Sequence, residues 1–119
     1  MKILAIDDTK TLLSLLCLTL RNAGHDVAAA ENGEEGLATF DKFKPDLVIT
    51  DLNMPLMDGI EFTRACRARP EGENIPIIML TTENGAEIKA EGRRAGASAW
   101  MVKPFEPSTL LGIVARYQG

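Results

Sequence analysis

Acidic, hydroxyl and lysine side chains stand at or directly after the ends of four short apolar runs in this chain. They are Asp7, Asp8, Asp51, Thr81 and Lys103. Short apolar runs of this kind are typical of strands that are buried on both faces of a sheet. The carboxyl ends of parallel strands meet at one edge of a sheet, where open α/β proteins place their binding sites. If the strands are parallel, these side chains converge, and their types indicate a site for a metal ion and a phosphoryl group.

The charges of the predicted cluster favour a cation. Carboxylates crowded together repel by roughly 4 kcal/mol per close pair at an intermediate effective dielectric. A divalent ion together with Lys103 would balance Asp7, Asp8 and Asp51. Oxygen ligands select a hard ion such as Mg²⁺ over zinc, and the chain has a single histidine, His25. The residues therefore predict a Mg²⁺ site that takes phosphate as a further ligand.

Asp51 is the candidate nucleophile of this site. It lies in the stretch 46–59, which reads D-L-V-I-T-D-L-N-M-P-L-M-D-G. Pro55 lacks an N–H and cannot continue a central strand, so the strand should end near Asp51. A carboxylate beside Mg²⁺ can attack phosphorus to give an acyl phosphate, with Lys103 and the hydroxyl of Thr81 contacting the phosphoryl oxygens. Because the chain has no Gly-rich phosphate loop, we expect a donor other than ATP. Taken alone, an aspartate after a buried strand is more often a cap or turn residue than a chemical one.

The elements that position these side chains alternate along the chain. Strands are expected over residues 2–6, 26–30, 47–50, 76–80 and 97–102, and helices over 9–23, about 33–43, from 59, 85–94 and from 107. Five strands alternating with five helices imply a parallel sheet with right-handed crossovers and helices on both faces. We therefore predict one α/β domain over residues 1–119.

The first expected helix carries more leucine than a core face requires. Cys17 falls opposite the expected core face, and Leu18 points well away from its centre. The surplus leucine indicates either a wide core face, which we prefer, or a docking surface. The expected core stripe consists of Leu12, Leu15, Leu16, Thr19, Leu20 and Ala23.

Composition excludes several classes of protein. A net charge of −4 and a pI near 5.0 argue against nucleic acid as the partner, because phosphate binding needs a basic face. No stretch approaches the roughly 20 apolar residues of a membrane span, and the start of the chain does not have the pattern of a secretory signal. Cys17 and Cys66 are far apart and unpatterned, which favours free thiols in a reducing cytoplasm. We expect a cytoplasmic protein that binds neither nucleic acid nor membrane.

The motifs, taken in order, resemble those of the receiver domains of two-component response regulators. They are I-D-D at the first strand, D-L-N-M-P-L-M-D-G around Asp51, T-T-E after the fourth strand and W-M-V-K-P-F at the fifth. The resemblance covers nearly all 119 residues, and the last motif is closest to single-domain, CheY-like chemotaxis regulators. It implies a flavodoxin/CheY-like doubly wound sheet of order 2-1-3-4-5, of which CheY is a standard example, with no output domain.

The resemblance also implies roles for the acidic residues. Asp51 would be the phosphoacceptor, and its donor would be a phosphohistidine of a histidine kinase or a histidine phosphotransfer domain. Mg²⁺ would be held by Asp8, Asp51 and the backbone carbonyl of Asn53, with Asp7 acting through water.

A switch is implied at the fourth and fifth strands. Thr81 would be the switch hydroxyl, and Trp100 stands where the family usually has a Tyr or Phe rotamer switch. Lys103 would pair with the phosphoryl group, through a cis bond to Pro104. Trp100 and Lys103 would also serve partner binding, on the surface formed by the fourth helix, the fifth strand and the last helix. The alternative for Trp100 is a partly exposed surface anchor.

The resemblance implies a monomeric signalling protein rather than an enzyme. Phosphorylation at Asp51 would shift an equilibrium between two states and alter binding to a protein target such as the flagellar motor switch, with a phosphatase as a further partner. A phosphate sink or phosphorelay intermediate is the alternative. A true phosphatase that uses Asp51 as nucleophile is disfavoured, because the chain is short and Asn53 stands in place of a second acid. A flavin-binding domain of the same fold would need a Ser/Thr-rich phosphate loop that the chain lacks.

Overall fold

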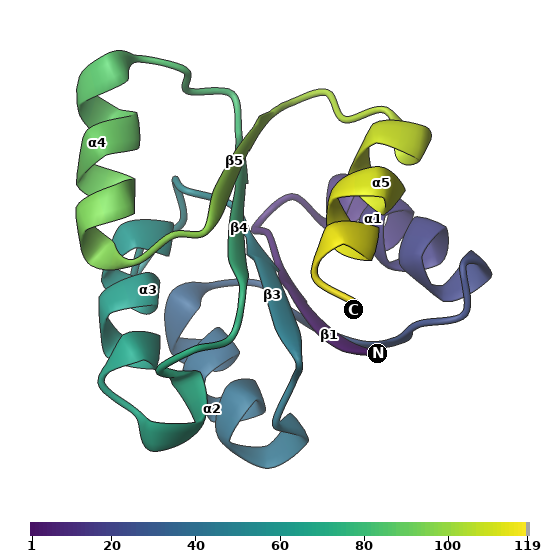
Figure 1. The fold of residues 1–119 in the computed structure, drawn as a ribbon, viewed down its shortest axis with the longest axis horizontal. Coiled ribbons are helices and arrows are strands. Elements are labelled where there is room, and N and C mark those ends of the chain that lie inside the picture. The colour runs from purple at the N-terminus through teal and green to yellow at the C-terminus, as the bar shows by residue number, and fades with distance from the viewer. Residues whose placement is uncertain (119) are drawn as a thin grey trace.

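The computed structural model describes residues 1–118 and alternates strands with helices (Figure 1). The strands are β1 (Lys2–Ile6), β2 (Asp26–Ala30), β3 (Leu47–Thr50), β4 (Ile77–Thr81) and β5 (Ala99–Val102). The helices are α1 (Lys10–Asn22), α2 (Gly33–Phe43), α3 (Gly59–Arg67), α4 (Ala86–Ala95) and α5 (Pro107–Arg116), with a short 3₁₀ turn, η1 (Pro70–Gly72), before β4. None of the helices in this described part of the chain is long and apolar enough to cross a membrane.

The five strands form one parallel sheet of order β2-β1-β3-β4-β5. Ile6 pairs with Thr50, and Thr50 in turn pairs with Met79, so β1 and β3 end at the same level. β4 continues for two residues further, to Thr81. The predicted doubly wound sheet and its strand order are confirmed, and the strand ends that carry the candidate residues share one edge.

Helices cover both faces of the sheet (Figure 1). α1 and α5 lie on one face, where their buried leucine and valine side chains pack against the strands. α2, α3 and α4 lie on the other face, over two further groups of buried side chains. Phe40 of α2 and Phe62 of α3 are the largest fully buried side chains of the molecule's described part. The sheet is therefore buried on both sides, as its continuous apolar strands require.

The predicted core stripe of α1 is wrong in part. Leu15, expected in the core, is 49% exposed, whereas Cys17, expected opposite the core, is buried. Leu18 is 55% exposed, as its expected position away from the core face predicts. The helix buries Leu13, Leu16, Cys17 and Leu20, which are spaced as one helical face. Leucine is so frequent in α1 that two neighbouring stripes are almost equally apolar, and packing against the sheet and α5 selects one of them. Both cysteines, Cys17 and Cys66, are free and buried.

Candidate functional site

Asp51 is held directly at the carboxyl end of β3. Its backbone N–H donates to the carbonyl of Ile6 at 2.8 Å, which extends the pairing of β1 with β3 by one residue. Its carboxylate oxygen Oδ1 accepts a hydrogen bond from the N–H of Leu52 at 2.8 Å. The residue is only 6% exposed. The backbone therefore fixes both the position and the orientation of this carboxylate.

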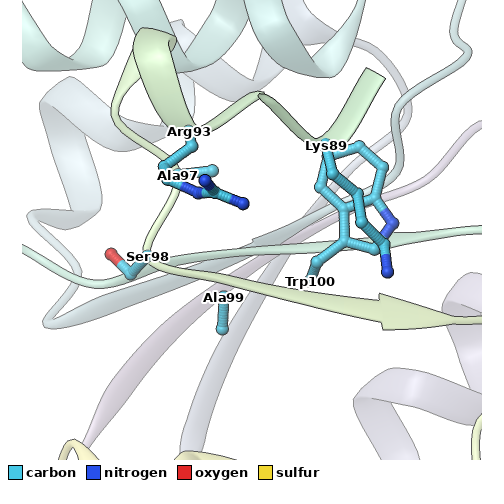
Figure 2. Close-up of a pocket in the computed structure, with 6 residues that line it drawn as sticks. All are labelled: Lys89, Arg93, Ala97, Ser98, Ala99 and Trp100. Atoms are coloured by element: carbon cyan, nitrogen blue, oxygen red, sulfur yellow. The ribbon is translucent and has the colours of Figure 1, made fainter. Parts of the chain in front are cut away.

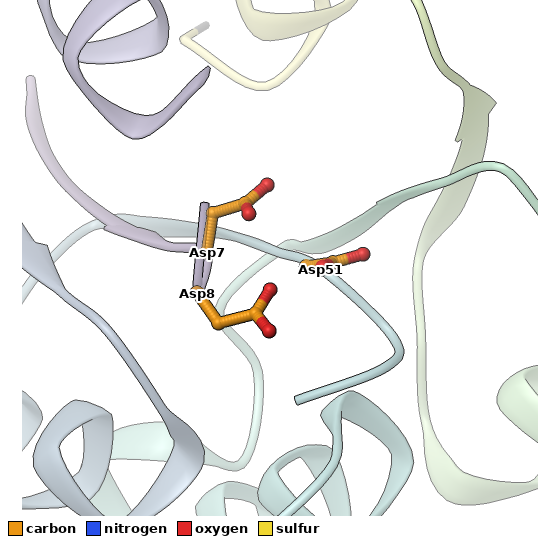
Figure 3. A group of neighbouring side chains, drawn as sticks. All are labelled: Asp7, Asp8 and Asp51. Atoms are coloured by element: carbon orange, nitrogen blue, oxygen red, sulfur yellow. The ribbon is translucent and has the colours of Figure 1, made fainter. Parts of the chain in front are cut away.

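Asp7 and Asp8 bring their carboxylates to Asp51 from the end of β1 (Figure 3). One oxygen from each of the three residues lies within 4.8 Å of the others. Asp7 is 1% exposed, and its Oδ1 accepts from the N–H of Thr9 at 2.9 Å, at the start of α1. Asp8 is exposed. The predicted convergence of the three aspartates is therefore present, and Asp8 lies on the side open to solvent.

Lys103 joins this cluster from the end of β5. Its Nζ lies 2.8 Å from Oδ2 of Asp7 and 3.2 Å from Oδ1 of Asp51. Burial by itself lowers the pKa of Lys103, but the hydrogen bond to Asp7 and the charge of Asp51 outweigh it, so the pKa lies above its ordinary value. Its bond to Pro104 is cis, as expected. Lys103 is thus a charged partner of both buried aspartates at neutral pH.

The lysine does not fully compensate the carboxylates. Burial, together with the charge of Asp7, raises the pKa of Asp51 to about 6, and Lys103 only partly opposes this. A second cation near Asp51 would favour the ionised carboxylate. Oxygen donors from three aspartates are the ligand type of a hard divalent ion. The three aspartates of the predicted metal set therefore fit Mg²⁺.

Thr81 and Asn53 both form hydrogen bonds with Glu83. Thr81 is fully buried at the end of β4, and its Oγ1 accepts from the N–H of Glu83 at 3.3 Å. The side-chain amide of Asn53 donates to Oε2 of Glu83 at 3.1 Å. Lys103 ties the neighbouring strand to this one, because its N–H donates to the carbonyl of Thr81 at 2.9 Å. Glu83 therefore contacts both Thr81 and Asn53. The sequence motifs identified it only as the last residue of T-T-E.

Trp100 lies outside the acidic cluster, on the side of β5 that faces α4. It is half-exposed, and its Nε1 donates to the backbone carbonyl of Glu83 at 2.8 Å. It also lines a surface hollow of about 250 Å³ between α4 and β5 (Figure 2). The lining residues are Lys89, Arg93, Ala97, Ser98, Ala99 and Trp100. Two cations and an indole therefore border this hollow, on the surface expected to bind partners.

The turn from β3 to α3 is closely packed behind Asp51. A Cβ on Gly59 would collide with the backbone carbonyl of Asp51 and approach the sulfur of Met79 at 2.9 Å. α3 begins here with a capping box, in which Asp58 Oδ1 accepts from the N–H of Glu61 at 2.8 Å and Glu61 Oε1 accepts from the N–H of Asp58 at 3.0 Å. The glycine of the M-D-G motif is therefore needed for close approach of the helix to the strand end.

Comparison with known proteins agrees with this geometry. The profile described as response regulator receiver domain matches residues 3–115. The chain is 38% identical to protein PilH of Pseudomonas aeruginosa over 110 residues, which cover 92% of this chain and 91% of PilH. It is similar in structure to the chemotaxis response regulator CheY4 of Vibrio cholerae, with a TM-score of 0.92 and 44% identity over 98% of this chain and 97% of CheY4.

A further similar structure is described with its metal. The receiver domain of sensor histidine kinase PA1611 from Pseudomonas aeruginosa has a TM-score of 0.90 and 27% identity, covers 98% of this chain and 95% of that one, and is described with a magnesium ion coordinated in the active site cleft. The profile match, the relatives and the acidic cluster at the end of the sheet agree. The chain belongs to the family of response regulator receiver domains.

Proposed function

We propose that Asp51 accepts a phosphoryl group from a phosphohistidine of a histidine kinase or a histidine phosphotransfer domain, in a Mg²⁺-dependent reaction. The observation that carries this proposal is the placement of Asp51, which is buried, contacts Lys103, and lies beside Asp7 and the exposed Asp8. A carboxylate in this environment is oriented, partly neutralised and accessible from one direction. These are the requirements for a nucleophile toward phosphorus.

Mg²⁺ would be held by Asp8, Asp51 and the backbone carbonyl of Asn53, with Asp7 acting through water. Receiver domains bind Mg²⁺ at an acidic pocket, and three aspartate oxygens of this chain lie within 4.8 Å of one another. When bound, the ion neutralises the oxygens of the phosphoryl group and of the cluster. The raised pKa of Asp51 supports this assignment, because an added cation favours the ionised form that attacks.

The hydrogen bonds indicate which oxygen of Asp51 attacks. Oδ1 receives the N–H of Leu52 and lies 3.2 Å from Nζ of Lys103, which leaves the electron pairs of Oδ2 for the reaction. The Oδ2–P bond forms as the P–N bond of the phosphohistidine breaks, and the bonding electrons leave with the imidazole of the donor. Lys103 and the hydroxyl of Thr81 then contact the phosphoryl oxygens and stabilise their charge.

We propose that a protein partner reads the phosphorylated state on the surface formed by α4, β5 and α5. Thr81 is linked to Trp100 through Glu83, whose N–H donates to Thr81 Oγ1 and whose carbonyl accepts from Trp100 Nε1. A Thr81 hydroxyl that turns toward a phosphoryl group would weaken the first of these bonds and move the loop that carries the second. Trp100 would thus act as the switch and, with Lys103, serve partner binding. The protein would act as a monomeric signalling protein, and a phosphatase would reset it.

The partner we propose is the flagellar motor switch. The support is similarity to CheY4, described as a chemotaxis response regulator, together with the cationic hollow beside Trp100. A phosphate sink or phosphorelay intermediate is the second candidate, since the acidic cluster serves either role. Binding to purified motor-switch protein, measured with and without beryllofluoride and Mg²⁺, separates the two. Binding that ignores phosphorylation would remove the motor-switch proposal.

Labelling of Asp51 tests the acceptor assignment. The protein is incubated with radiolabelled acetyl phosphate and Mg²⁺, and the label per chain is measured for wild type and for Asp51→Asn. The variant should not be labelled, whereas Asp26→Asn, which changes an exposed aspartate on β2, should be labelled as wild type is. Label that persists in Asp51→Asn at the same stoichiometry would refute the assignment.

A further inference from the structure

Gly92 lies in the middle of α4, directly against the six-membered ring of the Trp100 indole. A Cβ built on Gly92 would lie 2.7 Å from Cζ3, 3.4 Å from Cε3 and 3.7 Å from Cη2 of Trp100. All three atoms belong to the benzene ring of the indole, the second of its two fused rings, whereas tyrosine and phenylalanine have a single ring. Gly92 is buried, and it faces the sheet together with Ile88 and Ala95. The helix therefore has no room for a side chain at the point where the indole rests.

The position of this glycine is not explained by the helix itself. A glycine in a helix interior is destabilising relative to alanine, because it gains no packing and loses more backbone entropy. α4 ends separately at Gly96, which has a positive φ of 113° and is a normal C-cap. Gly112 of α5 provides a contrast within the chain, since a Cβ there would meet nothing within 4 Å. Gly92 differs from it in being buried against Trp100.

The opposite edge of the same indole is held by a hydrogen bond. Trp100 Nε1 donates to the carbonyl of Glu83 at 2.8 Å, and the N–H of Glu83 donates to Thr81 Oγ1 at 3.3 Å. The indole is thus held at two places: by the backbone of α4 at Gly92 and by the loop after β4 at Glu83. A shift of either element changes the space available to the ring. This arrangement connects Thr81, whose carbonyl accepts from the N–H of Lys103, with the surface of α4.

We propose that Gly92 is a positioning residue for the switch. By lacking a side chain, it lets the indole of Trp100 lie between α4 and the Glu83 carbonyl, so that a movement of Thr81 is passed to the surface of α4. The phosphorylation-dependent half of this inference rests on the proposed function, whereas the seating of the indole does not. A side chain at residue 92 displaces the ring and uncouples α4 from the loop after β4.

Fluorescence tests directly whether Gly92 allows the indole to lie between α4 and Glu83, because Trp100 is the only tryptophan. In Gly92→Ala the emission of the unphosphorylated protein should shift to longer wavelength, and quenching by acrylamide should increase, since the ring loses its bond to Glu83. Gly112→Ala, in a helix glycine that touches nothing, should leave both unchanged. Emission and quenching in Gly92→Ala that match wild type would overturn the proposal.

A change of ring size provides the second test and guards against a variant that merely misfolds. In a Trp100→Phe background the ring atoms that a Cβ at residue 92 would strike are absent. Gly92→Ala should then raise the melting temperature by about 4 °C, the usual gain for a helix glycine in a domain of this size, as Gly112→Ala should. In the wild-type background Gly92→Ala should give no such gain, or a loss. Equal effects in the two backgrounds would overturn the proposal, as would failure of the double variant to fold.

Phosphorylation separates this inference from the proposed function. Gly92→Ala should take up label from acetyl phosphate as wild type does, because the acidic cluster is untouched, while its fluorescence response to beryllofluoride and Mg²⁺ should be lost. A full wild-type response in the labelled variant would refute the coupling. Absence of label in every variant, wild type included, would instead refute the acceptor assignment. The emission and melting measurements would then still test whether Gly92 positions the indole of Trp100.

Discussion

Replacement of Asp51 by asparagine should stabilise the metal-free protein at neutral pH. Burial and the charge of Asp7 raise the pKa of Asp51 to about 6, against an ordinary value of 3.8. Because each pKa unit corresponds to about 1.4 kcal/mol, the ionised carboxylate costs the folded state up to about 3 kcal/mol above pH 6. Asparagine keeps the shape and an acceptor for the N–H of Leu52. Lys103 keeps its partner Asp7 at 2.8 Å.

The sign of the pH dependence follows from the raised pKa. The folded state binds the Asp51 proton more tightly than the unfolded state does, so wild type gains stability from this group as the pH falls from above 6 to below 3.8. Asp51→Asn has no such proton to bind. The stability advantage of the variant should therefore be about 3 kcal/mol larger at pH 7.5 than at pH 3.5. Urea unfolding at a series of pH values without divalent ions measures this difference, with Asp26→Asn as the control for the substitution itself.

Mg²⁺ should reverse the order of stabilities. An ion that binds only the folded state stabilises it by an amount that rises with its concentration, about 4.1 kcal/mol at 1,000 times its Kd, which exceeds the advantage of about 3 kcal/mol that the variant has without metal. Wild type should gain this stabilisation, whereas Asp51→Asn, which has lost a proposed ligand, should gain much less. A variant no more stable than wild type at pH 7.5 without metal, or a difference that does not change with pH, would show that Asp51 is not held at an electrostatic cost.

Four other changes test the rest of the site. Lys103→Gln should slow labelling by acetyl phosphate by about 100-fold, because a charge that stabilises the phosphoryl oxygens is removed; a wild-type rate would exclude this role. Addition of beryllofluoride and Mg²⁺ together should change the fluorescence of Trp100, and an unchanged spectrum with binding shown separately would exclude this residue as the switch. Gly59→Ala should cost roughly 2 kcal/mol or more in urea unfolding, since its Cβ would collide with the carbonyl of Asp51. Asp58→Ala should cost about 1 kcal/mol in the same assay through loss of the capping box, and an unchanged unfolding midpoint would contradict that.

The fold was predictable because its signals are local. Apolar runs that end on acids, and the Gly and Pro residues between them, define strands and turns without knowledge of distant contacts. Once the strands are parallel, chain direction alone places Asp7, Asp51 and Lys103 at one edge of the sheet. The strand order, in contrast, is not predicted by local signals but by resemblance to a family, and the strand pairings confirm it. The position of the acidic cluster in the fold can therefore be predicted from the sequence.

The first helix shows where local signals fail. With leucine on nearly every side, the periodicity of α1 cannot select a buried face, and it wrongly predicts that Leu15, which is 49% exposed, lies in the core. The face is selected by the sheet and by α5, which lie far away in sequence. The same holds for the indole of Trp100, because its contact with Gly92 and its bond to Glu83 depend on how closely α4 approaches β5.

The residue types of the site, and the sheet edge at which they gather, can be inferred from the order of residues along the chain, because strand and helix patterns depend on near neighbours. The interactions among these side chains arise only when separate elements pack together. That Lys103 contacts two aspartates at once, that Asp51 is held with a pKa of about 6, and that a glycine on α4 makes room for an indole on β5 all depend on distances of a few ångströms between separate elements. Such distances are set by packing of the whole core, which no local pattern encodes.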